Sequence, residues 1–361
     1  MDFTLTGDQR SLQGLAQQIL AKEATQERLD SLDAQGSWFD EPLWKQLADA
    51  GLVGAALKED VGGGGLGLTE LALVLEQVGA HAAQVPLLEV LVPALALDRF
   101  GSDDQRQVLR DLVSGTALVV AALTESGRED PARPATTAVL EGGTWTVNGI
   151  KSAVPLLDRA SKVIVSAATA AGPVLLLVEA SGTPAGKTTH GLPVFDLELD
   201  GTAAELLTDD PTALDWLLDR ARVAIAATAL GVSNKALRLS ATYTTEREQF
   251  GRAVATFQAV GHRLADAYID VEAIRLTTLQ AVWLLDEGLP AHDEARIAKW
   301  WAAEGGHRVA HAAQHVHGGV GIDMDYVLHR YFTWSKYLEF TLGGATAQAL
   351  SLGATLAAEP V

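Results

Sequence analysis

The chain has 361 residues, of which 48% are hydrophobic, so it can bury a sizeable core and form about two to three domains. It contains no cysteine, which excludes disulfides, thiolate metal sites and cysteine nucleophiles. A net charge of -19 opposes binding to nucleic acid or to an anionic membrane. The chain has no long apolar run, and polar residues occur throughout its start. We therefore expect no membrane span, no signal peptide and a cytoplasmic location.

Residues 2–115 show the spacing of amphipathic helices. Apolar residues recur every three or four positions over residues 12–19, and Pro42 opens another helix. A glycine-rich loop at residues 62–65 precedes a further apolar-periodic run. Such a loop could cradle a phosphate, but no strand precedes it and no Gly-Lys-Ser string follows. We therefore interpret this loop as a flexible connector between helices.

Residues 117–203 change to short runs rich in aliphatic and β-branched residues, separated by Gly, Pro and polar turns. The clearest runs lie at residues 118–123, 137–140, 144–147, 163–165 and 174–178. Gly142 and Gly143 stand between the second and third runs and predict a tight hairpin turn. The middle of the chain is therefore predicted to be a β domain.

Helical patterning returns after a connector rich in Pro and Asp at residues 209–211 and continues to the end of the chain. Three long helical stretches are predicted at residues 216–246, 257–287 and 293–317. No internal repeat is evident. The fold class predicted from these patterns is mostly α with a central β domain.

The string that begins at Arg247, R-E-Q-F-G-R, is part of the most specific stretch in the chain. Arg247, Gln249 and Arg252 gather hydrogen-bond donors beside the ring of Phe250, and Gly251 allows the backbone to turn. This combination suits an anionic, partly flat ligand. A solvated charged turn between two helices is the other interpretation of such a string when it stands alone.

The string and its continuation, F-Q-A-V at residues 257–260, together resemble the R-E-x-F-G-x-x-I/V-x-x-F-Q segment of the acyl-CoA dehydrogenase family. In that family the segment holds the pyrophosphate and adenosine part of FAD in the neighbouring subunit. The resemblance implies this role for Arg247, Gln249, Phe250 and Gln258. Residues 315–319, H-V-H-G-G, resemble the family's Q-x-x-G-G string. They imply further contacts to the cofactor from the residues His315, Gly318 and Gly319.

The resemblance covers essentially the whole chain, because the order helical, β, helical matches the family. It implies an N-terminal helical domain at residues 1–116, a β-sandwich or barrel-like middle domain at residues 117–210, and a C-terminal four-helix bundle that mediates oligomerisation at residues 211–361. The glycine loop at residues 62–65 and the E-Q-V-G string at residues 76–79 resemble segments that shape the substrate cavity in the family.

The catalytic base of the family is missing at both of its usual positions. The reaction removes a proton next to a CoA thioester while the neighbouring carbon passes a hydride to the flavin, so it needs a carboxylate base. Leu342 occupies the place of the glutamate in the family's Y-E-G-T string, and Ala221 occupies the alternative place. Arg222, which follows, could assist the substrate. Glu339 is the nearest acid and a candidate relocated base; if the segment is helical, it would lie on a face neighbouring that of Leu342.

The strings that seat the flavin ring in the family are also altered. The T-E-P-x-A-G-S-D loop begins as Thr124-Glu125 and then diverges. The G-x-K string is kept up to Lys151, but Ala153 and Pro155 stand where an aromatic residue and a hydroxyl residue are expected. Pro155 offers neither a hydroxyl nor a backbone donor.

These losses affect the contacts to a subunit's own flavin, while contacts to a neighbour's FAD mostly remain. The chain resembles the smaller, catalytically degenerate subunit of actinobacterial heterotetrameric acyl-CoA dehydrogenases, which act on steroid side-chain CoA thioesters. The resemblance implies an FAD shared across a subunit interface. It also implies a larger homologous catalytic subunit that binds most of the acyl-CoA substrate. We expect no nucleic acid or membrane partner.

Three other interpretations remain open at this point. The chain could be a self-sufficient homotetrameric dehydrogenase or oxidase with a displaced base such as Glu339, or an assembly subunit without flavin contacts. His307, His311 and His315 are spaced four apart on one predicted helix, as in some metal sites. No H-E-x-x-H string accompanies them, so we favour histidines on a buried interface helix and expect no metal.

Overall fold

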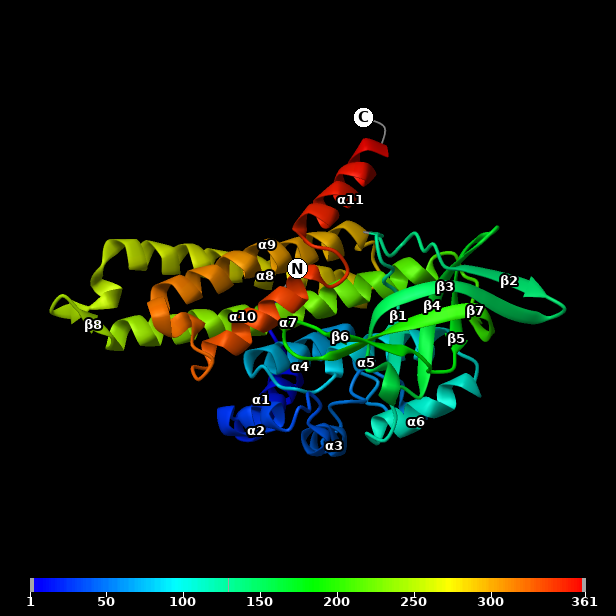
Figure 1. Ribbon diagram of the computed structural model, residues 1–361, viewed down its shortest axis with the longest axis horizontal. Helices are drawn as coiled ribbons and strands as arrows, with labels where there is room; N and C mark the ends of the chain where they lie inside the picture. Colours follow the sequence, from blue (N-terminus) through cyan, green and yellow to red (C-terminus); the bar gives the residue numbers. More distant parts are fainter. Residues whose placement is uncertain (1–2, 129, 359–361) are drawn as a thin grey trace. The chain divides into compact units, whose positions relative to one another are not determined.

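The structure is a computed structural model that describes residues 3–128 and 130–358 (Figure 1). The helices are α1 (Gly7–Glu23), α2 (Gln26–Ala34), α3 (Glu41–Asp49), α4 (Leu68–Ala80), α5 (Leu87–Phe100), α6 (Val108–Val113), α7 (Ala213–Glu246), α8 (Gln258–Asp286), α9 (His292–His317), α10 (Leu328–Phe340) and α11 (Ala345–Ala358). The strands are β1 (Val119–Ala122), β2 (Thr137–Glu141), β3 (Thr144–Pro155), β4 (Lys162–Thr169), β5 (Gly172–Val178), β6 (Thr183–Lys187), β7 (Pro193–Thr208), β8 (Glu248–Gln249) and β9 (Arg252–Ala253). Short 3-10 turns are η1 (Glu59–Val61), η2 (Gln105–Gln107), η3 (Leu157–Arg159), η4 (Val254–Thr256) and η5 (Gly318–Ile322).

The chain packs as two compact units that interleave in sequence. The first unit contains the residues up to 31, residues 72–83 and the residues from 222 onward, and the second contains residues 32–71 and 84–221. Three of the four boundaries fall inside α2, α4 and α7, and the fourth, between residues 83 and 84, follows α4. The predicted division at residues 116 and 210 follows the type of secondary structure rather than packing, and it stays a prediction.

The strands of the second unit close into a ring. β4 pairs with β2, β2 with β3, β3 with β7, β7 with β5, and β5 returns to β4. β1 extends the sheet beside β4 in parallel, and β6 pairs with β7. A ring of this kind has few free edges, which is characteristic of barrels. The predicted barrel-like middle domain is therefore confirmed.

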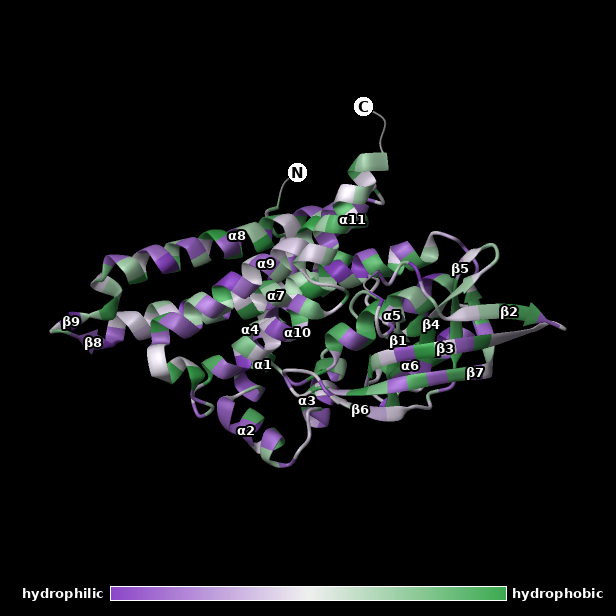
Figure 2. Ribbon diagram, turned by 45° about the horizontal axis from the view of Figure 1, so that its top comes forward, coloured by the Kyte–Doolittle hydropathy of each residue, from purple (hydrophilic) through white to green (hydrophobic). Residues whose placement is uncertain are grey.

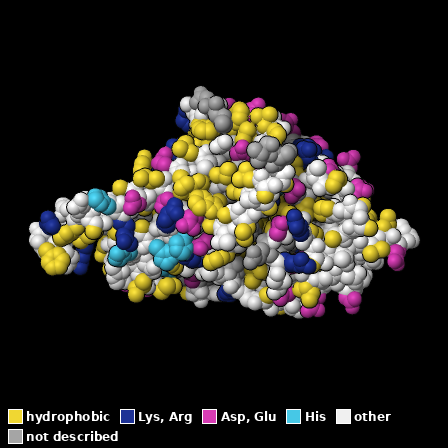
Figure 3. Space-filling view, turned by 90° about the horizontal axis from the view of Figure 1, so that it is seen from above, with side chains coloured by type: hydrophobic (Ala, Val, Ile, Leu, Met, Phe, Trp, Pro, Cys, Tyr) yellow, Lys and Arg dark blue, Asp and Glu magenta, His cyan; other side chains and the backbone are white. Residues whose placement is uncertain are grey.

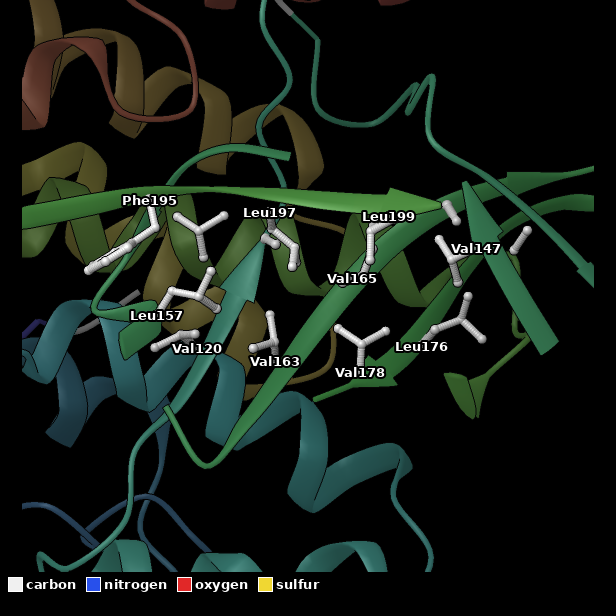
Figure 4. Packing of buried hydrophobic residues seen from close by; sticks show 14 of the residues in the cluster. Val120, Val147, Leu157, Val163, Val165, Leu176, Val178, Phe195, Leu197 and Leu199 are labelled. Carbon is white, nitrogen blue, oxygen red and sulfur yellow. The ribbon is translucent and has the colours of Figure 1, made fainter. Parts of the chain in front are cut away.

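The core of the ring consists of the aliphatic side chains that the strands direct inward (Figure 4). On β4, Val163 and Val165 belong to this core, as Leu176 and Val178 do on β5. Residues two apart on a strand share a face, so these alternating side chains form a continuous apolar layer.

The hairpin turn predicted between β2 and β3 is confirmed. Glu141 pairs with Thr144, and the two residues between them, Gly142 and Gly143, have φ values of +60° and +87°. A two-residue turn with positive φ at both positions matches the right-handed twist of the strands, and glycine adopts it without strain.

The glycine-rich loop at residues 62–65 is a connector, as predicted. The N–H of Gly63 donates to the carbonyl of Lys58, and the N–H of Gly65 donates to the carbonyl of Leu57. These amides are already paired within the loop and do not converge on a ligand. A Cβ at position 63 would lie 2.2 Å from the Leu57 carbonyl oxygen, so glycine is required by close packing rather than by a phosphate.

Helices α8 and α9 of the first unit pack against each other, and α9 also packs against α10 and α11. Buried residues on α8, including Ala267, Val271, Ile274, Thr278 and Ala281, recur every three to four positions. Hydrophilic and hydrophobic residues alternate along these helices (Figure 2). The helical N-terminal and C-terminal regions around a β-containing middle are confirmed. In the described part of the chain, no helix is long and apolar enough to cross a membrane.

Helices α4 and α7 approach closely where glycines remove the side chains. A Cβ on Gly79 would lie 2.1 Å from the Thr228 carbonyl oxygen, and a Cβ on Gly231 would lie 1.9 Å from the Glu76 carbonyl oxygen. Each helix therefore presents a glycine to the backbone of the other. This crossing places the E-Q-V-G string of α4 against α7.

Candidate functional site

The donor-rich string after α7 forms a two-stranded hairpin at the end of the helical bundle (Figure 1). The N–H of Arg247 donates to the Tyr243 carbonyl at 2.8 Å and so continues the last turn of α7. β8 then pairs with β9. Phe250 and Gly251 form the turn with φ values of +57° and +76°, which confirms the predicted turn at Gly251. Positive φ is strained for a bulky residue such as Phe250.

The last turn of α9 is held by an aromatic cluster. The ring of His317 stacks on Tyr243, with centroids 4.4 Å apart. Its Nδ1 lies 2.7 Å from the Ala313 carbonyl, and its Nε2 lies 3.3 Å from the Tyr326 hydroxyl. Burial lowers the pKa of His317, although the bond to Ala313 opposes this. We therefore assign a neutral imidazole that donates from Nδ1 and accepts at Nε2.

A pocket of about 740 Å³ lies between the hairpin, the start of α8 and the end of α9. Five of the seven predicted cofactor residues line it: Arg247, Gln249, His315, Gly318 and Gly319. These residues come from two segments separated by about 70 positions in the chain, and the fold brings them together. Their roles in binding stay predictions.

The lining of the pocket fits the pyrophosphate of a dinucleotide. The guanidiniums of Arg247 and Arg263 both line it, and neither forms an ion pair with a described residue, while Asp323 is the one carboxylate in the lining. Gly318 has φ +60° and ψ -136°, a conformation that glycine adopts readily. Nothing lies within 4 Å of a Cβ built on Gly318 or Gly319, so a ligand can approach their backbone. Guanidiniums are strong donors for phosphate oxygens.

Two of the predicted cofactor residues lie outside this pocket lining. Phe250 is 92% exposed at the tip of the hairpin, with its ring edge-on to Phe257. The guanidinium of Arg252 lies 4.1 Å from the Phe257 ring. Gln258 is also outside the lining, and its Nε2 lies 3.4 Å from Nε2 of His262. Phe250 and Gln258 therefore do not join the other five within this chain.

The position of the missing base lies in a turn, not on a helix. α10 ends at Phe340, and Leu342 is buried with a φ of +57°. Glu339 lies in the last turn of α10 and Leu342 lies beyond its end, so the two residues do not share a helix. The helix stops because Gly343 and Gly344 follow and Gly343 also takes a positive φ, of +91°.

The carboxylate of Glu339 is already engaged by neighbouring donors. Lys336 Nζ donates to Oε2 at 2.7 Å, and His307 Nδ1 lies 3.1 Å from Oε1 and 3.2 Å from Oε2. The side chain of Glu339 is only 14% exposed. A role as a relocated base would require these contacts to break.

Lys299 stabilises the turn that carries Leu342. Its side chain is fully buried, and its Nζ donates to the carbonyls of Glu339 at 3.0 Å and Gly343 at 2.9 Å. Burial lowers the pKa of Lys299 to about 7, Glu339 opposes the shift, and Arg222 adds to it. The lysine satisfies carbonyl groups that the end of α10 leaves without partners in the helix.

Replacing Lys299 with methionine should remove a pH dependence of stability. Between pH about 7 and about 10.5 the unfolded chain binds a proton at this lysine that the native chain lacks. Native stability therefore rises with pH in this window, by at most about 1.4 kcal/mol per pH unit. Urea denaturation from about pH 6.5 to about pH 9.5 measures the difference between wild type and variant. A constant difference contradicts the prediction, and Lys45→Met, at an exposed site, is the control.

The alternative base position and its arginine lie on α7. Ala221 is buried, with 8% of its surface exposed, and Arg222 is 2% exposed. The substrate role of Arg222 stays a prediction. The positive charge of Arg222 helps to lower the pKa of Lys299, so the two side chains interact electrostatically.

Glu125 and Lys151, from the two strings that resemble the family's flavin-ring segments, contact each other in the second unit. Lys151 Nζ donates to Glu125 Oε1 at 2.6 Å and to Ser166 Oγ at 3.1 Å. Ala153, where the family has an aromatic residue, is exposed and takes a φ of +55° within a bulge of β3. Pro155 pairs with Val194 at the end of the same strand. Lys151 and Glu125 are thus retained in contacts that need no ligand.

The three spaced histidines have different surroundings. The rings of His307 and His311 lie 4.4 Å apart, and His315 lines the pocket. Histidines gather on one exposed face beside basic and acidic side chains (Figure 3). Among the residues that the structure describes, no group of three His, Asp or Glu side chains is arranged to hold a metal ion.

The pocket also contains residues that were not predicted as cofactor contacts, namely Tyr243, Arg263 and His317. Tyr243 lies four positions before Arg247, one helical turn away, so helical spacing could have indicated it. Arg263 lies on the second turn of α8 and had no comparable signal. Only the return of α9 to the hairpin showed that these side chains share a pocket.

The helical regions, the central β ring and a pocket lined by two arginines are together features of a flavoprotein dehydrogenase. The chain belongs to the acyl-CoA dehydrogenase family. The family's C-terminal domain matches residues 212–356, and its N-terminal domain matches residues 6–116.

Several known proteins are similar over the full length. Acyl-CoA dehydrogenase FadE27 of Mycobacterium tuberculosis is 40% identical and is covered to 100%, as is this chain. A solved variant of the Tcur3481-Tcur3483 steroid ACAD has a TM-score of 0.94 and 46% identity, covering 98% of this chain and 99% of that one. The ChsE4-ChsE5 complex from Mycobacterium tuberculosis has a TM-score of 0.93 and 39% identity, with 100% of both chains covered.

Proposed function

We propose that the chain is the smaller subunit of a heteromeric, FAD-dependent acyl-CoA dehydrogenase. A larger homologous chain supplies the catalytic glutamate and binds most of the acyl-CoA. The present chain contributes contacts to the ADP side of FAD and to assembly. The reaction is the α,β-desaturation of a CoA thioester, and the proposed acyl group is a steroid side chain. The proposed assembly is a cytoplasmic heterotetramer with two copies of each chain.

One contrast carries this proposal. Arg247, Gln249 and the glycines that follow α9 line one pocket with a donor set suited to pyrophosphate. The two positions of the base hold Leu342 and Ala221, neither of which can take a proton. A chain that binds a cofactor without a base of its own is suited to complete the site of another chain.

The similar solved structures support a partner subunit. The Tcur3481-Tcur3483 steroid ACAD and the ChsE4-ChsE5 complex each pair two differently named chains. The full-length similarity, at 46% and 39% identity, makes an equivalent pairing the simplest arrangement for this chain. The steroid substrate is proposed on the same basis.

The residues of this chain act on binding rather than on the chemical step. When bound, FAD supplies the acceptor for the hydride. Arg247 neutralises phosphate charge, and Gln249 donates from its amide. His315 and the open backbone of Gly318 and Gly319 complete the surface against the ADP half. Phe250 projects from the hairpin tip, 92% exposed, and is proposed to reach the cofactor of the partner subunit.

A self-sufficient homotetramer with a displaced base is the first alternative. It is disfavoured because Lys336 and His307 already engage the carboxylate of Glu339. An assembly subunit without flavin contact is the second alternative. It does not explain why two arginines without an ion pair to any described residue share one pocket with a sterically open glycine turn.

Purification of the chain alone and with its larger partner separates these possibilities. The proposal expects an FAD-poor chain alone, and an active yellow complex that contains fewer flavins than subunits. Flavin absorbance and protein concentration give the ratio. Full FAD occupancy with turnover by the isolated chain supports the homotetramer and rejects the proposal. An active complex whose FAD content does not change when pocket residues of this chain are substituted supports the assembly subunit.

Replacing Arg247 with alanine should lower the affinity of the complex for FAD by about tenfold or more, because a charge-assisted hydrogen bond to phosphate is lost. Equilibrium dialysis of the complex followed by flavin absorbance measures the retention. Arg238→Ala is the matched control, since Arg238 is an α7 arginine outside the pocket whose Nε bonds to Asn234. Unchanged FAD content in the Arg247 variant would show that the cross-subunit contact is wrong.

A further inference from the structure

We infer that Arg263 is a second phosphate-binding residue, which forms with Arg247 an arginine clamp on the pyrophosphate of the ligand. No sequence motif indicated Arg263, and it lies 16 positions beyond Arg247. The inference rests on the proposed function and deepens it, because it identifies the anionic part of the ligand that the pocket selects.

The fold brings the two arginines to one pocket from different helices. Arg247 follows the last turn of α7, and Arg263 lies on the second turn of α8. The hairpin of β8 and β9 reverses the chain between them, and both side chains line the same pocket. Basic side chains are visible at this end of the bundle, on the left of Figure 3.

Neither arginine has a counter-ion among the residues that the structure describes, although other arginines of the bundle do. Arg308 pairs with Asp270, and Arg275 pairs with Glu272 at 2.6 Å. Arg247 and Arg263 have no such partner in a protein whose net charge is -19. Two like charges in one pocket repel each other unless an anion lies between them. Among the described residues no carboxylate, including Asp323 of the lining, forms an ion pair with either arginine, so the place between them is open to an anionic ligand.

The remaining lining narrows the class of ligand. Asp323 is held within its own turn, because its Oδ1 accepts the Asp325 N–H at 3.0 Å. The ring of Tyr243 and the side chains of Val260 and Val316 add apolar surface. Two cations beside an aromatic and aliphatic surface suit a nucleoside diphosphate better than a free simple anion. The pocket is therefore assigned to an ADP-like group, with Arg263 on its phosphates.

The test is isothermal titration calorimetry on the full chain with ADP, inorganic pyrophosphate and adenosine as probes. Arg263→Gln should lower the affinity for ADP and for pyrophosphate by about tenfold or more and leave the affinity for adenosine unchanged. Arg263→Lys should retain part of the affinity because it keeps the charge but loses the bidentate fork. Arg238→Gln, at an arginine outside the pocket, should change nothing. The FAD content of the partner complex is measured for the same variants.

The outcomes separate the clamp from the proposed function. If Arg247→Ala weakens pyrophosphate or FAD binding and Arg263→Gln does not, the clamp is wrong and the proposed function stands. If Arg263→Gln lowers the affinity for adenosine as much as the affinity for pyrophosphate, the residue shapes the pocket and does not bind phosphate. If the wild-type chain and its complex bind none of ADP, pyrophosphate and FAD, both the clamp and the proposed function fail.

Discussion

Replacing Gly231 with alanine is expected to lower the free energy of unfolding by about 3 kcal/mol or more. The new Cβ would lie 1.9 Å from the carbonyl oxygen of Glu76 and 2.7 Å from the backbone nitrogen of Ala80. Both atoms belong to the backbone of α4, so no side chain can rotate away. Helices α4 and α7 would have to separate, and the apolar surface between them would lose contacts. Urea denaturation followed by circular dichroism measures the change.

Gly261→Ala is the matched control for this prediction. Gly261 also lies in a long helix, α8, but nothing lies within 4 Å of a Cβ built on it. Alanine is the better helix former, so this variant should be stabilised by up to about 1 kcal/mol. Gly79→Ala should resemble Gly231→Ala, because its Cβ would lie 2.1 Å from the Thr228 carbonyl oxygen. Equal stability of the Gly231 and Gly261 variants would show that the two helices do not cross this closely.

Replacing Lys151 with methionine is expected to destabilise the β unit by about 3–5 kcal/mol, because it leaves the charge of Glu125 buried without its partner. The Lys151 side chain is fully buried and that of Glu125 is 7% exposed. Burial by itself would raise the pKa of Glu125. The hydrogen bonds from Lys151 and from the N–H groups of Thr136 and Ala135 outweigh it and lower the pKa to about 2. Chemical denaturation at neutral pH is the measurement.

The pair also predicts a dependence on pH. In the unfolded chain Glu125 has a pKa near 4.5, so the stabilisation by the pair is fully present above this value and is lost as the pH falls toward 2. The wild type should therefore lose stability faster than the Lys151 variant in that range. Glu125→Leu combined with Lys151→Met should be less destabilised than the sum of the single changes, because no unpaired charge remains.

Lys162→Met tests whether burial of the ion pair causes the large loss of stability expected for Lys151→Met. Lys162 pairs with Glu179 at 3.1 Å, but the two side chains are 29% and 85% exposed. An exposed pair contributes about 0–1 kcal/mol, so its loss should be small. If Lys151→Met and Lys162→Met have similar effects, the buried pair is not what stabilises this region.

This pair explains why parts of the flavin-ring strings are kept while their ligand contacts are lost. Thr124 Oγ1 donates to the Ser152 carbonyl at 2.6 Å, and the Ser152 N–H donates to the Thr124 carbonyl at 2.9 Å. Together with the bond between Glu125 and Lys151, these contacts join the end of β1 to β3. Ala153 lies just beyond them and takes part in no such contact through its side chain. The chain therefore has the family's residues where they form these internal contacts, and it has alanine at position 153, where the family has an aromatic residue facing the flavin ring.

The amino-acid sequence by itself determined the features that depend on neighbouring residues. Aliphatic runs predicted the strands of the β unit, and Gly142-Gly143 predicted their hairpin, because strand pattern and turn conformation are local properties. The three-to-four-residue period predicted α7, α8 and α9. The string from Arg247 and the leucine at position 342 led to the proposal that the chain contacts the ADP side of a flavin and lacks the catalytic base.

Only the tertiary structure decided what depends on contacts between distant segments. The β8–β9 hairpin brings Arg263 of α8 to the pocket of Arg247, and the return of α9 brings His317 there. The burial of Lys299 against the carbonyls of Glu339 and Gly343 stabilises the turn that follows α10. Local pattern cannot supply such facts, because the free energy of a buried charge or a close helix crossing depends on which groups the rest of the chain brings within a few ångströms.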